Sequence, residues 1–130
     1  MKIFGIGVDI IDNIRIKKLI KNKSFIKRIY SPSEIKKSFK NKNRTNFFSK
    51  RFAAKEALAK AFGTGFRKGI NFKDINIEND LIGKPYFVKN RKIDNFTKKI
   101  FKIKKYDIFL SISDEKKFSI AFVILYGVKW

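Results

Sequence analysis

The sequence predicts an α+β fold in which an antiparallel sheet packs against one long central helix. The first observation is a run of helix formers over residues 47–65, which contains no proline and no glycine before Gly63. The second is an alternating, glycine-containing strand pattern over residues 2–11. The third is a pair of strand patterns, residues 107–113 and 118–126, whose short connection predicts a hairpin.

The strand predicted over residues 2–11 has one apolar face and one nearly bare face. Alternation assigns to the apolar face Phe4, Ile6, Val8 and Ile10, and to the bare face Gly5, Gly7 and Asp9. Glycine and aspartate are depleted in strands, so the bare face needs a reason. Its glycines allow another backbone or a ligand to approach closely, with Asp9 at the edge of the cleared surface. Alternatively, Asp9 marks the strand's end or caps the next helix.

Basic residues dominate the helix predicted over residues 12–23. Its inward side is expected to carry Ile14, Leu19 and Ile20, and its outer side Arg15, Lys17, Lys18 and Lys21. The outer side is either an ordinary solvated face or a docking surface for an acidic partner. A short helical turn over residues 25–30 follows, and Pro32 after a capping serine begins a helix that runs towards Lys40. Residues 41–46 read as a polar connection.

Apolar positions cover most of the circumference of the central helix, so we expect it to be largely buried. Glu56 and Lys60 share a narrow polar edge with Ser49. The pair is either an ordinary exposed ion pair or part of a site. The buried setting and the Gly-Thr-Gly turn of residues 63–65 favour a site.

Beyond residue 65 the pattern predicts short strands over residues 73–79 and 85–89, joined by a turn over residues 81–85. A basic helix over residues 90–104 follows. Residues 118–126 are apolar on both faces, which predicts a central strand. No linker or repeat divides the chain, so the 130 residues are expected to form a single domain.

Composition limits the chemistry that this chain can perform. It contains no cysteine and no histidine, which excludes thiolate nucleophiles, serine–histidine triads and the common zinc sites. A general base must then be a carboxylate, a lysine or a water, and a metal would have oxygen ligands. The net charge of +21 points to a polyanionic partner, unless AT-rich codon drift explains the surplus lysine. No signal peptide or membrane-spanning stretch is evident, so the sequence predicts a cytoplasmic protein.

Two carboxylates occupy unusual places, Asp9 on the bare strand face and Glu56 on the buried helix. Lys60 lies one turn beyond Glu56, and a glycine loop follows. Paired carboxylates suit magnesium completed by substrate phosphates, a lysine suits developing phosphate charge, and free backbone amides suit phosphate. The residues alone thus suggest a site for metal-assisted phosphoryl transfer.

The same residues lie in motifs of a known family. The motifs are GIGVDI (5–10), RFAAKEALAKAFGTG (51–65), FKDINI (72–77), GKPYF (83–87) and LSIS (110–113). In this order they resemble the bacterial holo-acyl-carrier-protein synthases, small members of the 4'-phosphopantetheinyl transferase superfamily. The resemblance spans nearly the whole chain and implies the fold of that superfamily.

The resemblance implies transfer of 4'-phosphopantetheine from coenzyme A to a serine of apo-acyl carrier protein, with release of adenosine 3',5'-bisphosphate, in fatty acid biosynthesis. By similarity, Asp9 and Glu56 hold Mg²⁺ and Lys60 neutralises the transferring phosphoryl group. The positions that match the coenzyme A site are Arg51, Lys60, Gly63, Thr64, Gly65, Lys84, Pro85 and Ser113. The base implied for the incoming serine is Glu56 or a metal-bound water.

The family also implies partners. Acyl carrier proteins are acidic and dock on a basic first helix, where Arg15 matches the family pattern. Family members form homotrimers with interfacial sites, and the expectation is that Asp9 comes from one subunit and the Glu56 helix from its neighbour. No membrane and no nucleic acid is expected as a partner.

One position departs from the family, because Asp114 stands where a histidine is common. An anion there should repel the nucleotide unless it turns away or binds a cation. An inactive relative is therefore one alternative. The other is a basic module that binds RNA or DNA, although the chain lacks a recognisable RNA-binding signature.

Overall fold

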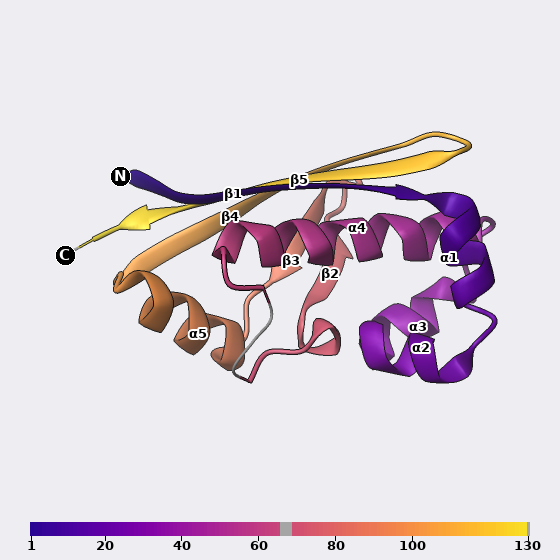
Figure 1. Cartoon of the computed structure of the whole chain (residues 1–130), viewed down its shortest axis with the longest axis horizontal. Coiled ribbons are helices and arrows are strands. Elements are labelled where there is room, and N and C mark those ends of the chain that lie inside the picture. The colour runs from indigo at the N-terminus through magenta and orange to yellow at the C-terminus, as the bar shows by residue number, and fades with distance from the viewer. Residues whose placement is uncertain (66–68, 130) are drawn as a thin grey trace.

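A long helix, α4, lies along one face of a three-stranded antiparallel sheet in the order β1-β5-β4 (Figure 1). The computed structural model describes residues 1–65 and 69–129. In chain order the elements are β1 (Lys2–Asp12), α1 (Asn13–Leu19), α2 (Lys23–Ile29), α3 (Pro32–Ser38), α4 (Arg44–Phe62), the 3₁₀ turn η1 (Phe72–Asp74), β2 (Asn76–Asn79), β3 (Pro85–Val88), α5 (Arg91–Phe101), β4 (Lys105–Asp114) and β5 (Phe118–Val128).

The sheet confirms the predicted hairpin and the predicted central strand. β4 and β5 pair antiparallel, and β5 also pairs with β1, so β5 lies between the two edge strands. The short strands β2 and β3 form a separate two-stranded sheet. In Figure 1 the helices α1, α2 and α3 gather at one end of α4, and α5 lies towards the other end.

The core forms where α4 meets the sheet. Thirteen of its 19 residues are buried, which confirms the prediction of a largely buried helix. The side chains of Phe48, Ala57 and Leu58 are fully buried, as are Val123 and Leu125 of β5. Burial of this apolar surface is the main force that holds α4 against the sheet.

The two glycines of β1 explain how closely α4 approaches the sheet. A Cβ atom added to Gly5 would lie 1.9 Å from the carbonyl oxygen of Ala61, and one added to Gly7 would lie 1.8 Å from that of Ala57. The bare face of β1 therefore packs closely against another backbone, which is the first of the two alternatives predicted for this face. That backbone belongs to the chain's own helix.

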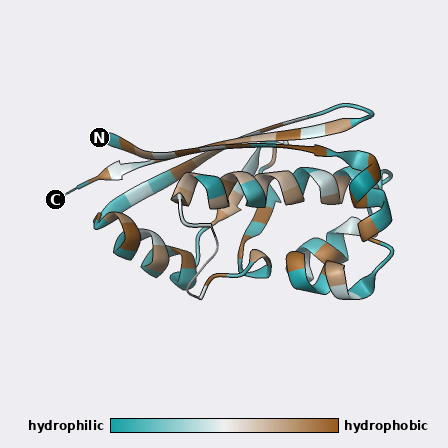
Figure 2. Cartoon of the chain, in the orientation of Figure 1, coloured by the Kyte–Doolittle hydropathy of each residue, from teal (hydrophilic) through white to brown (hydrophobic). Residues whose placement is uncertain are grey.

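The apolar face of β1 consequently points away from α4. Ile6, Val8 and Ile10 are each more than half exposed, and neighbouring strands add the exposed side chains of Phe109, Ile120 and Phe122. In Figure 2 strongly hydrophobic stretches run along β1, on the layer opposite the helices. We call these six residues the open sheet face.

Several boundaries differ from the prediction. The central helix begins at Arg44, inside the predicted polar connection, because the Asn43 side chain accepts a hydrogen bond from the Asn46 amide (3.1 Å) and caps the helix. In α1 the fully buried residue is Ile16, whereas Ile14, which was predicted to face inward, is exposed.

The strand β2 is shorter than the predicted strand over residues 73–79. Residues 72–74 form the turn η1, in which the Asp74 side chain accepts a hydrogen bond from the Asn71 amide (3.0 Å). The strand itself begins at Asn76. Within the described residues, no helix is both long enough and apolar enough to cross a membrane.

Candidate active site

Asp9 and Lys60 meet where β1 crosses α4. The Nζ atom of Lys60 lies 3.1 Å from Oδ1 of Asp9 and donates a hydrogen bond to the carbonyl oxygen of Val8 (3.0 Å). Asp9 does not cap the next helix, because Asp12 accepts the hydrogen bond from the Ile14 amide (2.9 Å). The first alternative for Asp9, a side chain at the edge of the cleared surface, is the one observed.

Glu56 lies one helical turn before Lys60 and close enough to Asp9 for the two carboxylates to interact. Partial burial raises the pKa of Glu56, and the negative charge of Asp9 raises it further. The positive charges of Lys60 and Arg15 act in the opposite direction. The ion pair of Lys60 is with Asp9, so the alternative of an ordinary ion pair between Glu56 and Lys60 is not the one observed.

The carboxylate cluster has two members. Among the described residues there is no group of three or more histidine, cysteine, aspartate or glutamate side chains that could hold a metal ion. The donor set at this site is therefore Asp9 and Glu56, two hard oxygen ligands. Such a sparse set matches a cation that keeps waters and completes its shell with substrate phosphates.

The predicted glycine turn begins directly after this cluster. Gly63 ends α4 in the left-handed conformation (φ 77°), and its amide donates to the Lys60 carbonyl (3.0 Å). Gly65 also has a positive φ of 68°. Both conformations favour glycine. Thr64, between them, is exposed, so this turn presents backbone and a hydroxyl close to the Asp9–Lys60 pair.

An open groove of about 900 Å³, the larger groove, has Glu56 in its wall. α1 contributes Arg15 to it, and α2 contributes Phe25, Lys27, Arg28 and Ile29. Its other lining residues are Leu19, Ser24, Phe52, Ile70, Asn71, Phe72 and Lys73. An apolar floor with basic residues and one carboxylate suits a partner that is acidic and partly apolar.

A smaller groove of about 340 Å³ contains two of the other predicted site residues, Arg51 and Pro85. Its remaining lining residues are Asn41, Phe47, Lys50, Asn79, Gly83, Ile112 and Asp114. Lys84 and Ser113, also predicted, are chain neighbours of lining residues. The smaller groove is thus lined by two of the predicted residues, and two more directly follow or precede lining residues in the chain.

The side chain of Arg51 is buried, and several neighbours hold it in place. Its Nη2 atom donates to Oδ1 of Asn79 (3.1 Å), its guanidinium lies 3.8 Å from the centre of the Phe47 ring, and its Nε atom is 3.7 Å from Oε2 of Glu34. Burial lowers its pKa, and nearby carboxylates oppose that shift. These contacts fix the guanidinium in the wall of the smaller groove.

Asp114 lines the smaller groove together with Lys50 and Arg51. Its Oδ2 atom accepts a hydrogen bond from Asn46 Nδ2 (3.0 Å). The negative charge that replaces the common histidine is thus held by an amide donor and shares its groove with two cations, which reduce the repulsion that an anionic ligand would meet.

One chain brings Asp9, Glu56 and Lys60 together. The expectation that Asp9 and the Glu56 helix come from different subunits is therefore wrong. The close approach of α4 to the glycines of β1 is the reason, because it places both carboxylates on adjoining elements of one chain. Arg51 and Glu56 are five residues apart on α4 and line different grooves.

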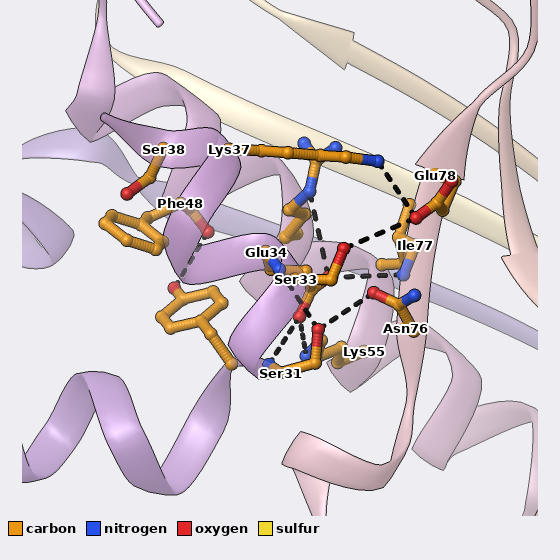
Figure 3. A network of polar contacts seen from close by, with 12 residues as sticks. Ser31, Ser33, Glu34, Lys37, Ser38, Phe48, Lys55, Asn76, Ile77 and Glu78 are labelled. Carbon is orange, nitrogen blue, oxygen red and sulfur yellow. Dashed lines mark hydrogen bonds and ion pairs between the residues drawn. The ribbon is translucent and has the colours of Figure 1, made fainter. Parts of the chain in front are cut away.

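No sequence pattern predicted a role for the buried pair Lys55 and Glu34. Glu34 is fully buried and forms a capping box with Ser31, and Lys55 Nζ lies 2.6 Å from its Oε1 atom (Figure 3). Two features of the sequence could have indicated this pair. The Ser-x-x-Glu spacing of residues 31–34 is typical of a capping box. A lysine on an apolar side of a helix needs a buried acidic partner.

Known proteins identify the family to which this chain belongs. The model of the 4'-phosphopantetheinyl transferase superfamily matches residues 5–123. The holo-[acyl-carrier-protein] synthase of Pelagibacter ubique is 61% identical over 125 residues, which cover 96% of this chain and 98% of that protein. The chain belongs to the holo-[acyl-carrier-protein] synthases of the 4'-phosphopantetheinyl transferase superfamily.

Solved structures of holo-[acyl-carrier-protein] synthases confirm the α+β fold with its sheet on a long helix. The enzyme of Neisseria meningitidis matches with a TM-score of 0.87 at 38% identity, over 97% of this chain and 100% of that one. The enzyme of Bacillus anthracis, solved in complex with CoA (3',5'-ADP), matches with a TM-score of 0.80 at 37% identity, over 97% and 98% of the two chains.

Proposed function

We propose that this chain transfers 4'-phosphopantetheine from coenzyme A to a serine hydroxyl of apo-acyl carrier protein and releases adenosine 3',5'-bisphosphate. The observation that carries the proposal is the Asp9–Glu56–Lys60 cluster, which lies within the family motifs and joins β1 to α4. Membership of the holo-[acyl-carrier-protein] synthases supports the same reaction.

The residues present fit a magnesium ion. Asp9 and Glu56 offer oxygen ligands. Burial raises the pKa of Glu56, and the negative charge of Asp9 raises it further, so the two carboxylates repel each other. A divalent cation held by both carboxylates would relieve that repulsion. When bound, it supplies positive charge to the pyrophosphate of coenzyme A. Asp9 and Glu56 are the residues that would hold it.

The chain's own groups account for the rest of the chemistry. The serine oxygen attacks the phosphorus on the pantetheine side of the pyrophosphate, and the bond from that phosphorus to the departing adenosine bisphosphate breaks. Lys60 balances negative charge on the transferring group. Glu56 is the proposed acceptor of the serine proton, because the chain has no histidine and Glu56 lines the groove proposed to receive the carrier.

The larger groove is the proposed docking surface for the acidic carrier protein. Arg15 and Glu56 both line it, so a carrier bound there has its serine close to the reacting groups. Lys27, Arg28 and Lys73 add positive charge to the same groove. Such charges raise the association rate and make it sensitive to salt.

A homotrimer is the proposed assembly. The open sheet face presents a band of large apolar side chains, which a monomer would leave in water. The smaller groove lies apart from the Glu56 cluster in one chain, so a neighbouring chain is proposed to supply Arg51, Lys84, Pro85 and Ser113 to the nucleotide end of coenzyme A. A cytoplasmic location stays a prediction.

Calorimetry with coenzyme A tests the proposed site. We expect binding that strengthens when magnesium is added and that loses this dependence in Asp9→Asn. A nucleic-acid module would bind RNA or DNA instead, and would show no magnesium-dependent binding of coenzyme A. That result would remove the proposed function.

A further inference from the structure

A buried lysine lies directly behind the larger groove. Lys55 is fully buried, and its ammonium donates to Oε1 of Glu34 (2.6 Å), to the carbonyl oxygen of Ile29 (2.8 Å) and to that of Phe72 (3.1 Å). All three hydrogens of the ammonium are therefore used. Nothing in the transfer chemistry described above requires this group.

The two carbonyls belong to separate segments of the groove wall. Ile29 is the last residue of α2, and Phe72 begins η1. Both residues line the larger groove, and Phe52 and Glu56 of α4 line it as well. Lys55, which precedes Glu56 on α4, thus connects two wall segments that are 43 residues apart in the sequence.

Glu34 holds the ammonium in place. Its carboxylate also accepts hydrogen bonds from the amides of Ser31 (2.9 Å) and Ile77 (3.2 Å), so it is anchored to the start of α3 and to β2 (Figure 3). A carboxylate with fixed partners orients the lysine in one direction. If the ammonium swung towards solvent, the buried Glu34 would keep only the more distant Arg51 (Nε to Oε2, 3.7 Å) as a charged partner.

We propose that Lys55 is a positioning residue for the carrier protein, because its ammonium joins α2 to η1 and so sets the shape of the larger groove. This inference rests on the proposed function, in which that groove receives the carrier. Lys55 does not touch the reacting atoms. Its loss should weaken carrier binding and leave coenzyme A binding and the chemical step nearly intact.

The experiment measures steady-state constants for carrier protein and for coenzyme A in the wild type, in Lys55→Met and in the double variant Lys55→Met with Glu34→Gln. The double variant avoids a buried carboxylate that has lost its closest charged partner, which could prevent the single variant from folding. We expect the carrier KM to rise about tenfold in both. The coenzyme A KM and kcat should change less than about threefold.

Tyr30→Phe is the matched control. It removes a buried hydrogen bond from Tyr30 to the Phe48 carbonyl (2.8 Å), which lies outside the groove lining. This variant should melt at a lower temperature with an unchanged carrier KM. An equal rise of the carrier KM in the control would show a general loss of stability and overturn the positioning role.

A normal carrier KM in the double variant would overturn the role of Lys55 alone. A wild type that makes no holo-carrier protein would overturn the proposed function as well.

Discussion

Gly7 of β1 faces the backbone of Ala57 in α4 so closely that a Cβ atom would lie 1.8 Å from the Ala57 carbonyl oxygen. Two residues along the same strand face, Asp9 meets Lys60 of the next helical turn at 3.1 Å. The glycine contact and the carboxylate site are therefore one geometric arrangement. A helix held farther from the strand would separate Asp9 from both Glu56 and Lys60.

Gly7→Ala should destabilise the fold by about 3 kcal/mol or more, because the clash is with backbone that cannot move without shifting α4. Urea unfolding followed by circular dichroism measures the loss. Gly83→Asn is the comparison: a Cβ atom at Gly83 meets nothing within 4 Å, so the loss there comes from its positive φ of 89° alone and should be smaller. Wild-type stability in Gly7→Ala would show that α4 does not pack as described.

Glu56→Gln should abolish transfer and slightly stabilise the metal-free fold at pH 8. The folded pKa of Glu56 is raised, so stability falls as the pH rises through that pKa, and the amide removes this loss. We expect a rise in melting temperature of about one to three degrees at pH 8. The rise should vanish at a pH below the unfolded value of the carboxyl group.

Thermal melts with and without magnesium complete this test. Magnesium should raise the melting temperature of the wild type and of the control Glu115→Gln, whose side chain is exposed, and leave that of Glu56→Gln unchanged. Full transfer by a folded Glu56→Gln protein would remove Glu56 from the mechanism.

Arg15→Glu should raise the carrier KM by about tenfold or more and change the coenzyme A KM less than about twofold. The reason is that Arg15 lines the larger groove, where the reversed charge would repel an acidic carrier. Lys17→Glu is the control, because Lys17 lies on the same helix outside the lining of that groove. Equal losses for both substrates would argue against carrier docking there.

Ile10→Asp should dissociate the proposed homotrimer, because Ile10 is 59% exposed in one chain and belongs to the open sheet face. Light scattering during gel filtration measures the mass directly. Phe39→Asp introduces the same charge at another exposed apolar residue, away from that face, and should keep the assembly. A wild type that elutes as a monomer would contradict the trimer.

The architecture could be predicted from the sequence because local signals agreed. Glycine-free helix formers marked α4, alternation marked the strands, and Pro32 after a serine marked α3. The start of α4 was missed because Asn43 caps it from within a polar stretch, where Arg44 also packs on the rings of Phe39 and Phe48. Such long-range contacts leave no periodic pattern.

The cluster of Asp9, Glu56 and Lys60 could be predicted because each residue broke a local pattern or lay within a family motif. The partner of Lys60 could not, because the choice between Glu56 and Asp9 depends on how closely β1 packs on α4. The network of Lys55 also went unpredicted. Its partners come from α3, from the end of α2 and from η1, which only the folded chain brings together.

Intact-mass analysis of apo-acyl carrier protein after incubation with this protein, coenzyme A and magnesium, with a chelator control, tests the transfer reaction most directly. We predict that the carrier gains the mass of one phosphopantetheine and that the chelator prevents the gain. No gain with coenzyme A still bound would contradict activity and indicate an inactive relative, with Asp114 as the first residue to replace. No gain and no coenzyme A binding would contradict the proposed function itself.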